Sequence, residues 1–273
     1  DTTHQTILNE INSVLNNIDN QTKILVVDDN SPDGTKYVVM DMMKEIPNLF
    51  LYNREKKQGL GKAYTSTFIF LIEDENIETI ISMDADLSHD PINIPIMLEK
   101  RKNFDVVIGS RYIKGGSIEG WELWRKLLSY GGNFYTRNIV RVPIKDFTSG
   151  FMAMSAGSLK QVDLNAIGSS GYAFLIELKH ALYSLTPRIN EIPIVFRNRV
   201  EGESKISNHI IKEGIRAPWR LLMKKKITNI NCPSCGTVIH KRIGSKNYYH
   251  FYKCSNCSMY RINPLPSNNA DIY

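Results

Sequence analysis

Hydrophobic residues are spaced like a helix at the start of the chain and run together like strands soon after it. Residues 1–17 place apolar side chains every three or four positions, which predicts a helix with one buried face. Residues 24–27, which follow Lys23, form an unbroken apolar run that ends in a polar turn, and residues 50–52 form a second short run. Such runs are typical of strands buried on both faces, so this region predicts alternating strands and helices around a parallel sheet.

A third apolar run, residues 80–83, ends in the acidic pair Asp84 and Asp86, with Ala85 between them. Ligands of open α/β sheets bind where parallel strands end, so the pair is placed for chemistry. Two carboxylates and a substrate phosphate can share one hard cation such as Mg²⁺. Asp and Pro also mark ordinary strand ends, so the motif alone leaves a solvated turn as an equal alternative.

Two earlier turns belong to the same predicted sheet edge. Asp28 and Asp29 follow the first strand; Asp29 can accept a hydrogen bond from a nucleobase, and the turn can also cap the next helix. Gly59 and Gly61 precede Lys62 at a predicted helix start, where glycines allow a ligand to come close and Lys62 can meet a phosphate. A plain helix entry is the more common meaning of that turn. The alternating order of strands and turns favours a nucleotide-binding half.

Two late segments complete the hydrophobic pattern. Residues 191–196 form a strand, in which Pro193 indicates an edge position because proline lacks the N–H that a central strand needs. Residues 206–226 alternate apolar and basic positions, as does a helix that lies on an anionic membrane surface. A helix packed on the domain with a solvated basic end is the alternative, and we expect Pro218 to interrupt that helix.

Composition narrows the class of protein. The 273 residues are 42% apolar and 23% charged, values typical of a globular protein. That length suffices for one domain of roughly 200–230 residues and a small appendage. No apolar run approaches the ~18 residues that span a bilayer, and no signal peptide opens the chain, so we do not expect the chain as given to cross a membrane. The only cysteines form two Cys-x-x-Cys pairs, which suit a metal site in a reducing compartment, so we expect a cytoplasmic protein. The net charge of +6 favours an anionic partner such as a phosphorylated ligand, a lipid head group or nucleic acid.

All four cysteines lie near the C-terminus, as Cys232, Cys235, Cys254 and Cys257, in the pattern Cys-x2-Cys-x18-Cys-x2-Cys. This spacing predicts a zinc ribbon, in which four thiolates hold a structural Zn²⁺ that stabilises a segment too small for its own core. A redox pair is the less favoured alternative. Basic and aromatic residues between the pairs suit nucleic-acid binding, but an ordinary hairpin face is favoured, so nucleic acid is not an expected partner.

Seven segments follow one another along the chain: residues 26–35 (VVDDNSPDGT), 59–63 (GLGKA), 83–89 (MDADLSH), 109–112 (GSRY), 115–129 (with GG, Trp121 and RKLLS), 146–151 (DFTSGF) and 199–205 (RVEGESK). Together they resemble family 2 inverting glycosyltransferases of the GT-A fold, specifically dolichyl-phosphate mannosyltransferases. The resemblance extends from residue 1 to about residue 226. It implies an α/β fold, the Rossmann-like mixed sheet of nucleotide-diphospho-sugar transferases flanked by helices, with the small zinc-ribbon β module appended.

The resemblance also implies a domain layout with departures from the family pattern. We expect a glycosyltransferase domain at 1–226 that lacks the family's first strand, a zinc ribbon at 227–266, and a tail at 267–273 that continues in the natural chain. The ribbon resembles those that precede methyltransferase domains. Met152 stands where the family usually has Arg, so one basic contact is lost or supplied elsewhere.

By resemblance, the enzyme transfers mannose from GDP-mannose to a polyprenyl phosphate such as dolichyl phosphate, bound peripherally at the cytoplasmic face of a membrane. Asp84 and Asp86 would hold Mg²⁺ or Mn²⁺. The donor-binding residues would be Asp28, Asp29, Lys62, Asp84, Ala85 and Asp86. The acceptor phosphate would be bound by Arg111, Arg125, Ser129, Arg199, Ser204 and Lys205. The residues with catalytic roles would be Asp84, Asp86, Arg111, Arg125 and Lys205.

Two other functions stay open at this point. One is a polyprenyl-phosphate glycosyltransferase that uses another donor, such as UDP-glucose. The other is a non-catalytic adaptor whose zinc ribbon binds nucleic acid or protein. The intact acidic pair argues against the adaptor.

Overall fold

The structure, a computed structural model, describes residues 2–18, 21–169, 171–198, 208–223, 230–232, 234–239, 242–246 and 249–263. Its N-terminal part alternates helices and strands as predicted. The elements are α1 (Thr2–Leu15), β1 (Ile24–Asp28), α2 (Thr35–Met42), β2 (Leu49–Asn53) and α3 (Leu60–Ile72). β1 and β2 pair in parallel, which confirms the predicted βα units.

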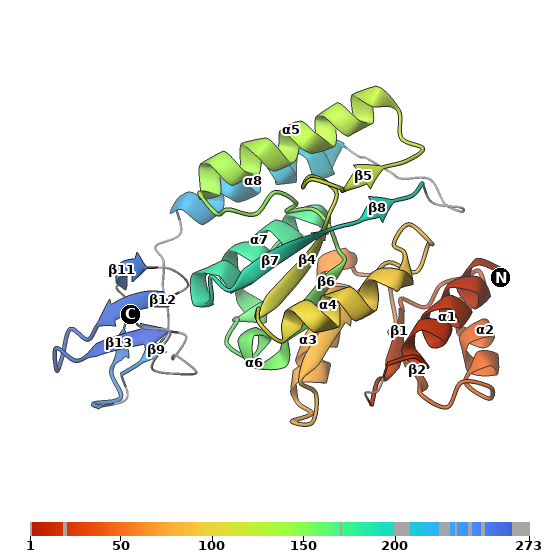
Figure 1. The fold of residues 1–273 in the computed structure, drawn as a ribbon, viewed down its shortest axis with the longest axis horizontal. Helices are drawn as coiled ribbons and strands as arrows, with labels where there is room; N and C mark the ends of the chain where they lie inside the picture. The colour runs from red at the N-terminus through yellow and green to blue at the C-terminus, as the bar shows by residue number, and fades with distance from the viewer. Residues whose placement is uncertain are drawn as a thin grey trace.

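The middle of the chain forms the larger sheet and the helices that cover it (Figure 1). Its strands are β3 (Thr79–Ser82), β4 (Val106–Ser110), β6 (Met152–Ser155) and β7 (Ile189–Pro193), in the order β3-β6-β4-β7. β6 runs antiparallel to β3 and β4, whereas β4 and β7 are parallel, so the sheet is mixed as expected. The remaining elements are two short 3-10 turns (Pro91–Asn93, Leu164–Ala166), α4 (Ile94–Arg101), β5 (Ser117–Ile118), α5 (Leu123–Val140), α6 (Ala156–Leu159), α7 (Gly171–Leu185), β8 (Val195–Phe196) and α8 (Asn208–Met223).

Alternating side chains of the central strands build two hydrophobic cores. Val106 and Ile108 of β4 pack with buried residues of α3, α6 and α7 on one face. Val107, between them, packs with residues of α1, α2 and α4 on the other face. Since successive strand side chains point to opposite faces, one strand serves both layers. Met152, where the family usually has Arg, is fully buried in the first core, so any basic contact must come from another residue.

The first strand pair departs from expectation. We expected β1 to be buried on both faces, but Val27 is 36% exposed. The two faces of β1 are covered unequally: Ile24 and Val26 share one face and pack in the second core, whereas Leu25 and Val27 share the other face and belong to neither core of the described residues. In the part of the chain that the structure describes, β1 pairs with β2 and β3 with β6, so the two strand groups are separate sheets.

The two proline predictions had opposite outcomes. Pro193 ends β7, which lies at the edge of the larger sheet and, within the described residues, pairs with β4 alone, as predicted. Pro218 does not interrupt its helix: α8 continues from Asn208 to Met223 with Pro218 inside it. Packing explains this, because Ala217 and Leu221 are buried beside Pro218 and α8 lies along α5 and α7 (Figure 1). Tertiary burial here outweighs the cost of one lost backbone hydrogen bond.

The C-terminal part is a small β module beside the main domain (Figure 1). β9 (Ile230–Asn231) pairs with β10 (Val238–Ile239), and β11 (Arg242–Lys246), β12 (Tyr249–Lys253) and β13 (Tyr260–Asn263) form a three-stranded antiparallel sheet. Among the described residues, its core consists of Cys232, Ile239, Tyr252 and Cys254. Over the described residues, no helix has both the length and the hydrophobicity that crossing a membrane requires.

Candidate functional site

The acidic pair lies in the loop that leaves β3. The backbone N–H of Asp84 donates to Nδ1 of His89 at 3.1 Å, which closes the loop on itself. One oxygen of Asp86 accepts from the Ser88 N–H at 3.1 Å and from the Ser88 hydroxyl at 2.5 Å. Leu87 adopts φ 62°, a left-handed conformation that costs an ordinary residue about 1 kcal/mol. The structure therefore holds both carboxylates in a strained, internally bonded loop at the strand end.

His89 anchors this loop without adding charge to it. Its Nδ1 accepts a backbone hydrogen bond, so that nitrogen carries no proton. Burial lowers the pKa of His89, even though Asp84 is close, with its carboxylate oxygen 3.9 Å from Nδ1. Because the ring stays neutral, the negative field of the acidic pair remains available to a cation.

Tyr64 and Gly150 form the wall beside Asp84. A Cβ on Gly150 would lie 2.8 Å from the Tyr64 hydroxyl and 3.4 Å from Oδ1 of Asp84, so only glycine leaves room here. Ser82 fixes this wall, because its hydroxyl donates to the Gly150 carbonyl at 2.7 Å. Burial, with the charge of Asp84, raises the pKa of Tyr64, which keeps its hydroxyl protonated. Sequence reasoning missed Tyr64; its place two residues after Lys62, inside a segment bounded by site motifs, was the available signal.

The turn after β1 holds the two carboxylates predicted to face the donor. Asp28 is buried and accepts the backbone N–H of Ser31 at 3.3 and 3.2 Å, as a turn-capping residue does. Asp29 pairs with Nη1 of Arg54 at 2.5 Å. Arg54 is buried and also donates to Gln58 at 3.1 Å. Arg54, which sequence reasoning did not assign, thus holds the Asp29 side chain in place.

The glycine-rich turn is built differently from the expectation. Gly59 has φ 91° immediately before α3, a conformation that favours glycine. Gly61 does not leave room for a ligand: a Cβ there would lie 2.6 Å from the carbonyl oxygen of Ser169, so its role is close packing. Lys62 is exposed in the first turn of α3, as predicted.

Arg111 and Asp146 form a buried, two-pronged ion pair. Nε of Arg111 donates to Oδ2 of Asp146 at 2.8 Å, Nη2 donates to Oδ1 at 2.8 Å, and the Arg111 backbone N–H adds a third bond at 3.1 Å. Nη2 also donates to the Thr148 hydroxyl at 2.7 Å. Burial favours the uncharged forms, but the mutual attraction prevails, lowering the pKa of Asp146 to about 2 and raising that of Arg111. Arg111 was predicted to bind a phosphate, and the structure places its charge against Asp146.

Other buried groups fix the loop that carries Asp146, residues 146–150. Lys179 is fully buried, and its ammonium donates to the carbonyls of Asp146 and Ser149 at 2.9 and 2.7 Å. Burial lowers the pKa of Lys179 to about 7. Glu191 accepts the Asp146 N–H at 3.0 Å, and Asn133 of α5 accepts the Phe147 N–H at 2.7 Å. The loop is therefore tied to α5, α7 and β7.

The remaining predicted acceptor residues divide into described and undescribed ones. Ser129 of α5 accepts a 2.6 Å hydrogen bond from Tyr112, whose pKa is raised by burial. Arg125 stacks on Trp121, with its guanidinium carbon 3.9 Å from the ring centroid. The structure thus brings Arg111, Arg125 and Ser129 into one cluster of contacts around Tyr112 and Trp121. Three predicted residues lie outside the described residues: Arg199, Ser204 and Lys205.

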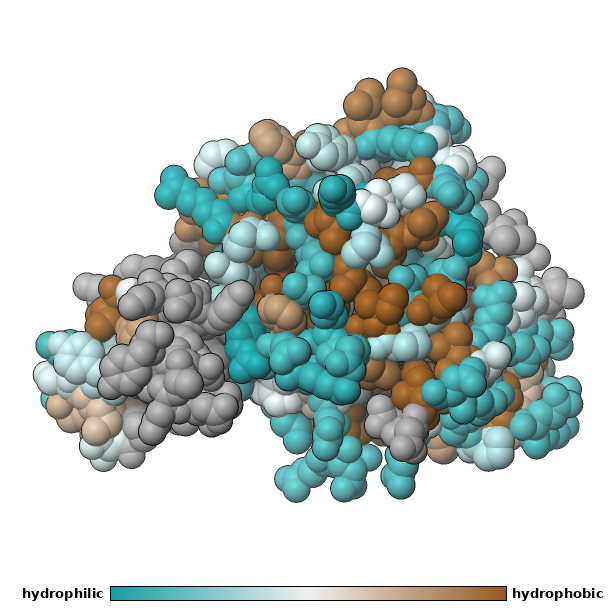
Figure 2. Space-filling view, in the orientation of Figure 1, coloured by the Kyte–Doolittle hydropathy of each residue, from teal (hydrophilic) through white to brown (hydrophobic). Residues whose placement is uncertain are grey.

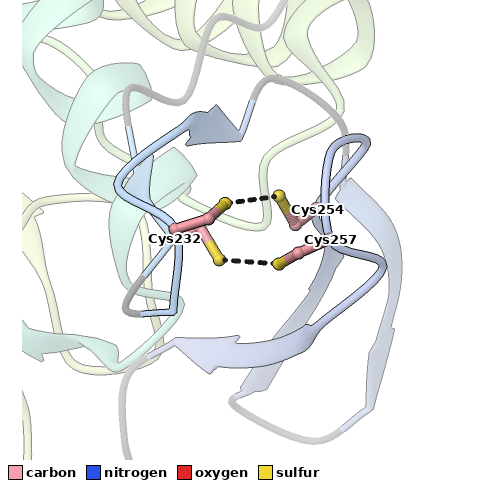
Figure 3. A group of neighbouring side chains, drawn as sticks. Cys232, Cys254 and Cys257 are labelled. Atoms are coloured by element: carbon pink, nitrogen blue, oxygen red, sulfur yellow. Dashed lines mark hydrogen bonds between the residues drawn. The ribbon is translucent and has the colours of Figure 1, made fainter.

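The four cysteines meet as predicted. Their sulfur atoms all lie within 4.8 Å of one another, with Cys232 and Cys257 at 3.5 Å and Cys235 and Cys254 at 3.6 Å. Figure 3 shows the sulfurs of the two knuckles facing each other. Four sulfurs at about 2.3 Å from a tetrahedral Zn²⁺ stand about 3.8 Å apart, so this arrangement suits that ion closely. It is the one group of three or more candidate ligands found among the described residues.

Known proteins resemble this chain in sequence over most of its length. Residues 4–163 match glycosyl transferase family 2. The chain is 38% identical over 195 residues to the undecaprenyl-phosphate mannosyltransferase of Micrococcus luteus, covering 71% of this chain and 80% of that protein. It is 36% identical over 197 residues to the polyprenol monophosphomannose synthase of Mycolicibacterium smegmatis, covering 71% and 74%. It is also 36% identical over 205 residues to the dolichol-phosphate mannosyltransferase of Pyrococcus furiosus, covering 73% of this chain and 55% of that one.

Solved structures share the fold at lower identity. Glucosyl-3-phosphoglycerate synthase from Mycobacterium tuberculosis, in complex with phosphoglyceric acid, superposes with a TM-score of 0.54 at 16% identity, covering 81% of this chain and 75% of that one. The same enzyme with Mn²⁺, UDP-glucose and phosphoglyceric acid gives a TM-score of 0.52 at 15% identity, covering 77% and 75%. At such identity the likeness establishes the GT-A architecture alone.

Replacing Asp146 by Asn should destabilise the fold by about 3–5 kcal/mol, because it leaves Arg111 charged and buried without its partner. The folded-state pKa of Asp146, about 2, is below its ordinary value of 3.8, so the carboxylate contributes fully above pH 4. That contribution is lost as the pH falls from about 4 to 2. Urea unfolding of both proteins across this range should show their difference shrinking.

Asp41→Asn is the matched control, since Asp41 forms an exposed pair with Lys44 that contributes little. A loss for Asp146→Asn no larger than for Asp41→Asn would contradict the assignment of the ion pair.

The cysteine geometry predicts one Zn²⁺ per chain. Cys254→Ser should release it, and since the module's core is so small, this should also unfold residues 230–263 while the main domain keeps its melting transition. Metal content measured by mass spectrometry, with circular dichroism, checks both effects. Ser255→Ala, on the same knuckle, should keep its zinc; equal zinc in the Cys254 variant would refute the site.

Proposed function

Because the chain belongs to glycosyl transferase family 2 and is a glycosyltransferase of the GT-A fold, we propose that it transfers mannose from GDP-mannose to a polyprenyl phosphate, with inversion. The observation that carries the proposal is that three relatives, each 36–38% identical, are named as mannosyltransferases or a mannose synthase of polyprenyl-type phosphates. The arrangement of charged groups around β3, α5 and residues 146–150 supports it.

The donor would lie at the end of β3. Asp84 and Asp86 are the residues to hold Mg²⁺ or Mn²⁺, since hard cations take carboxylate oxygens and the donor's diphosphate can complete the shell. When bound, the cation neutralises charge that develops on the GDP leaving group. Asp29, held by Arg54, would accept hydrogen bonds from the base, and Lys62 would meet a phosphate. Asp28 would shape the turn through Ser31, and Ala85 would leave space beside the donor.

The acceptor would approach from α5. Its phosphate oxygen is anionic near neutral pH, so attack on the anomeric carbon needs no strong general base. The protein must instead hold two anionic partners together, which requires positive charge near the acceptor. Arg125 has no carboxylate partner among the described residues and would supply it, with Ser129 as a hydrogen-bond donor. Arg111, whose charge is paired with Asp146, would hold residues 146–150 in place beside the acceptor phosphate. Arg199, Ser204 and Lys205 complete the proposed set.

The polyprenyl phosphate would be reached from a membrane surface. α5 and α8 lie side by side and expose large apolar side chains, including Leu123 at 71% and Leu127 at 62% on α5 and Ile215 and Trp219 on α8. In Figure 2 brown residues cap the end of the molecule over α5. Exposed Lys212 and Arg216 on α8 would meet anionic head groups. This face would bind the protein peripherally to the cytoplasmic side of a bilayer.

The two-part layout is also part of the proposal, with catalysis in residues 1–226 and a structural zinc ribbon in 227–266. Among the described residues β1 and β3 each have one unpaired edge, and a strand inserted between them would join the two sheets into one. The ribbon's four thiolates would leave no open position on Zn²⁺, so the ribbon would take no part in sugar transfer.

Changing Asp84 and Asp86 to Asn should lower transfer from GDP-mannose by at least about a hundredfold, because the cation on the leaving group loses its ligands. Transfer to a short-chain polyprenyl phosphate in detergent, with Mn²⁺, is the measurement. Glu75→Gln, an exposed change away from the loop, should leave the rate unaltered.

Three results would oppose this proposal. Faster transfer from UDP-glucose than from GDP-mannose would identify the other donor. No transfer from either donor, with metal-dependent GDP binding unchanged in the double variant, would favour a non-catalytic adaptor. A double variant as active as wild type would remove the role of the acidic pair.

Leu123→Ser combined with Leu127→Ser should weaken binding to vesicles that contain phosphatidylglycerol by roughly tenfold or more, since each leucine buries apolar surface worth about 1.5–3 kcal/mol at full burial. Vesicle co-sedimentation measures this. Ile92→Ser, at an equally exposed apolar position away from α5 and α8, should bind like wild type. Equal binding by the leucine variant would place the membrane face elsewhere.

A further inference from the structure

Arg125 is held by a ring instead of by a carboxylate. Its guanidinium carbon lies 3.9 Å from the centre of the Trp121 ring, which is close stacking. Its Nε is buried and has no hydrogen-bond partner in the described part of the chain. A buried donor left without an acceptor costs about 1–3 kcal/mol, so the stack must compensate for it. Arg111, by contrast, is paired with the carboxylate of Asp146, which compensates its charge. The charge of Arg125 is not compensated in this way.

Trp121 is itself the end of a column of rings that begins at the acidic loop. His89, whose Nδ1 accepts the Asp84 N–H, lies edge-on to Phe196, with centroids 5.4 Å apart. Phe196 in turn meets Trp121 edge-to-face at 5.5 Å. The guanidinium of Arg111 also lies over the Phe196 ring, at 5.3 Å. Side chains from three separate segments thus connect the loop of Asp84 to the guanidinium of Arg125.

We propose that Trp121 is a positioning residue that presents Arg125 to the phosphate of the acceptor. The flat indole face orients the planar guanidinium, and the ring column sets its place relative to Asp84 and Asp86. Stacking leaves the charge uncompensated, so Arg125 keeps its full attraction for a phosphate monoester. The inference rests on the proposed function for the identity of that ligand, but it concerns how the cation is held.

Trp121 has a second possible role, the filling of space between β8 and α5, and substitutions separate the two. A space-filling residue would tolerate Arg125→Lys, because lysine keeps the charge and the indole stays in place. A positioning residue would not, because an ammonium lacks the planar face that the indole orients. The two roles also differ in coupling: only a positioning role makes the effect of changing Trp121 depend on Arg125.

Binding of farnesyl phosphate to the full chain, measured by calorimetry, tests this without requiring turnover. Trp121→Leu and Arg125→Lys should each weaken binding about tenfold, and Trp121→Phe about threefold or less, as expected for loss or partial retention of a cation–π contact. Adding Trp121→Leu to Arg125→Gln should change affinity less than twofold. Mn²⁺-dependent GDP binding should be unaltered in every variant.

Phe70→Leu is the matched control, because it removes an aromatic ring stacked on Tyr52 away from α5 and should bind like wild type. Melting curves identify any variant that fails to fold; if Trp121→Leu is one, Arg125→Lys and Trp121→Phe carry the test. Wild-type affinity in Arg125→Lys, full additivity of the double change, or no farnesyl phosphate binding by wild type would overturn the proposal. Binding that depends on Trp121, without any mannose transfer, would support it while refuting the proposed function.

Discussion

The buried ion pair between Arg111 and Asp146 is the contact on which the rest of the site depends. It joins the end of β4 to residues 146–150, and that loop in turn touches nearly every other part of the site. Lys179 of α7 holds the loop's carbonyls, Asn133 of α5 holds Phe147, and Ser82 of β3 holds Gly150. Since Gly150 lies against Asp84, the pair fixes the acidic loop and α5 in one frame. The pair acts mainly by fixing these positions, because the cost of desolvating two buried charges offsets much of the energy of their attraction.

The neighbouring residues Arg111 and Arg125 consequently have different roles. Arg111 gives its guanidinium to Asp146 and becomes part of the framework, whereas Arg125 rests on Trp121 and keeps its charge available. An enzyme that unites a nucleotide diphosphate with a phosphate monoester must overcome repulsion between anions. In the proposed function, a cation at the end of β3 and an uncompensated arginine on α5 would divide that task between donor and acceptor. Burial lowers the pKa of His89, so its ring adds no positive charge beside Asp84.

The sequence predicted those features that depend on local pattern. Periodicity located α1 and the strand pair β1–β2, Pro193 indicated the edge position of β7, and cysteine spacing located a site whose sulfurs do converge. Features that depend on contacts between residues far apart in the sequence could not be predicted from it. Asp146 lies 35 residues from Arg111, so nothing local marked them as partners. Pro218 stays helical because α5 and α7 cover α8, and Val27 is exposed because its face of β1 packs into neither core of the described residues. The sequence did contain a signal for Lys179: it lies four residues after Leu175 and three before Leu182, which are buried on the same side of α7.

In the proposed function, the loop of Asp84 and Asp86 binds the donor's diphosphate through a divalent cation. Arg125 faces the acceptor's phosphate on the other side of the site. A crystal structure of the full chain with GDP, Mn²⁺ and farnesyl phosphate tests this most directly. We expect Mn²⁺ in contact with oxygens of Asp84, Asp86 and the diphosphate, and the farnesyl phosphate group within hydrogen-bond distance of Arg125, with the guanidinium still stacked on Trp121. Mn²⁺ bound away from both aspartates, or the phosphate group remote from Arg125, would contradict it.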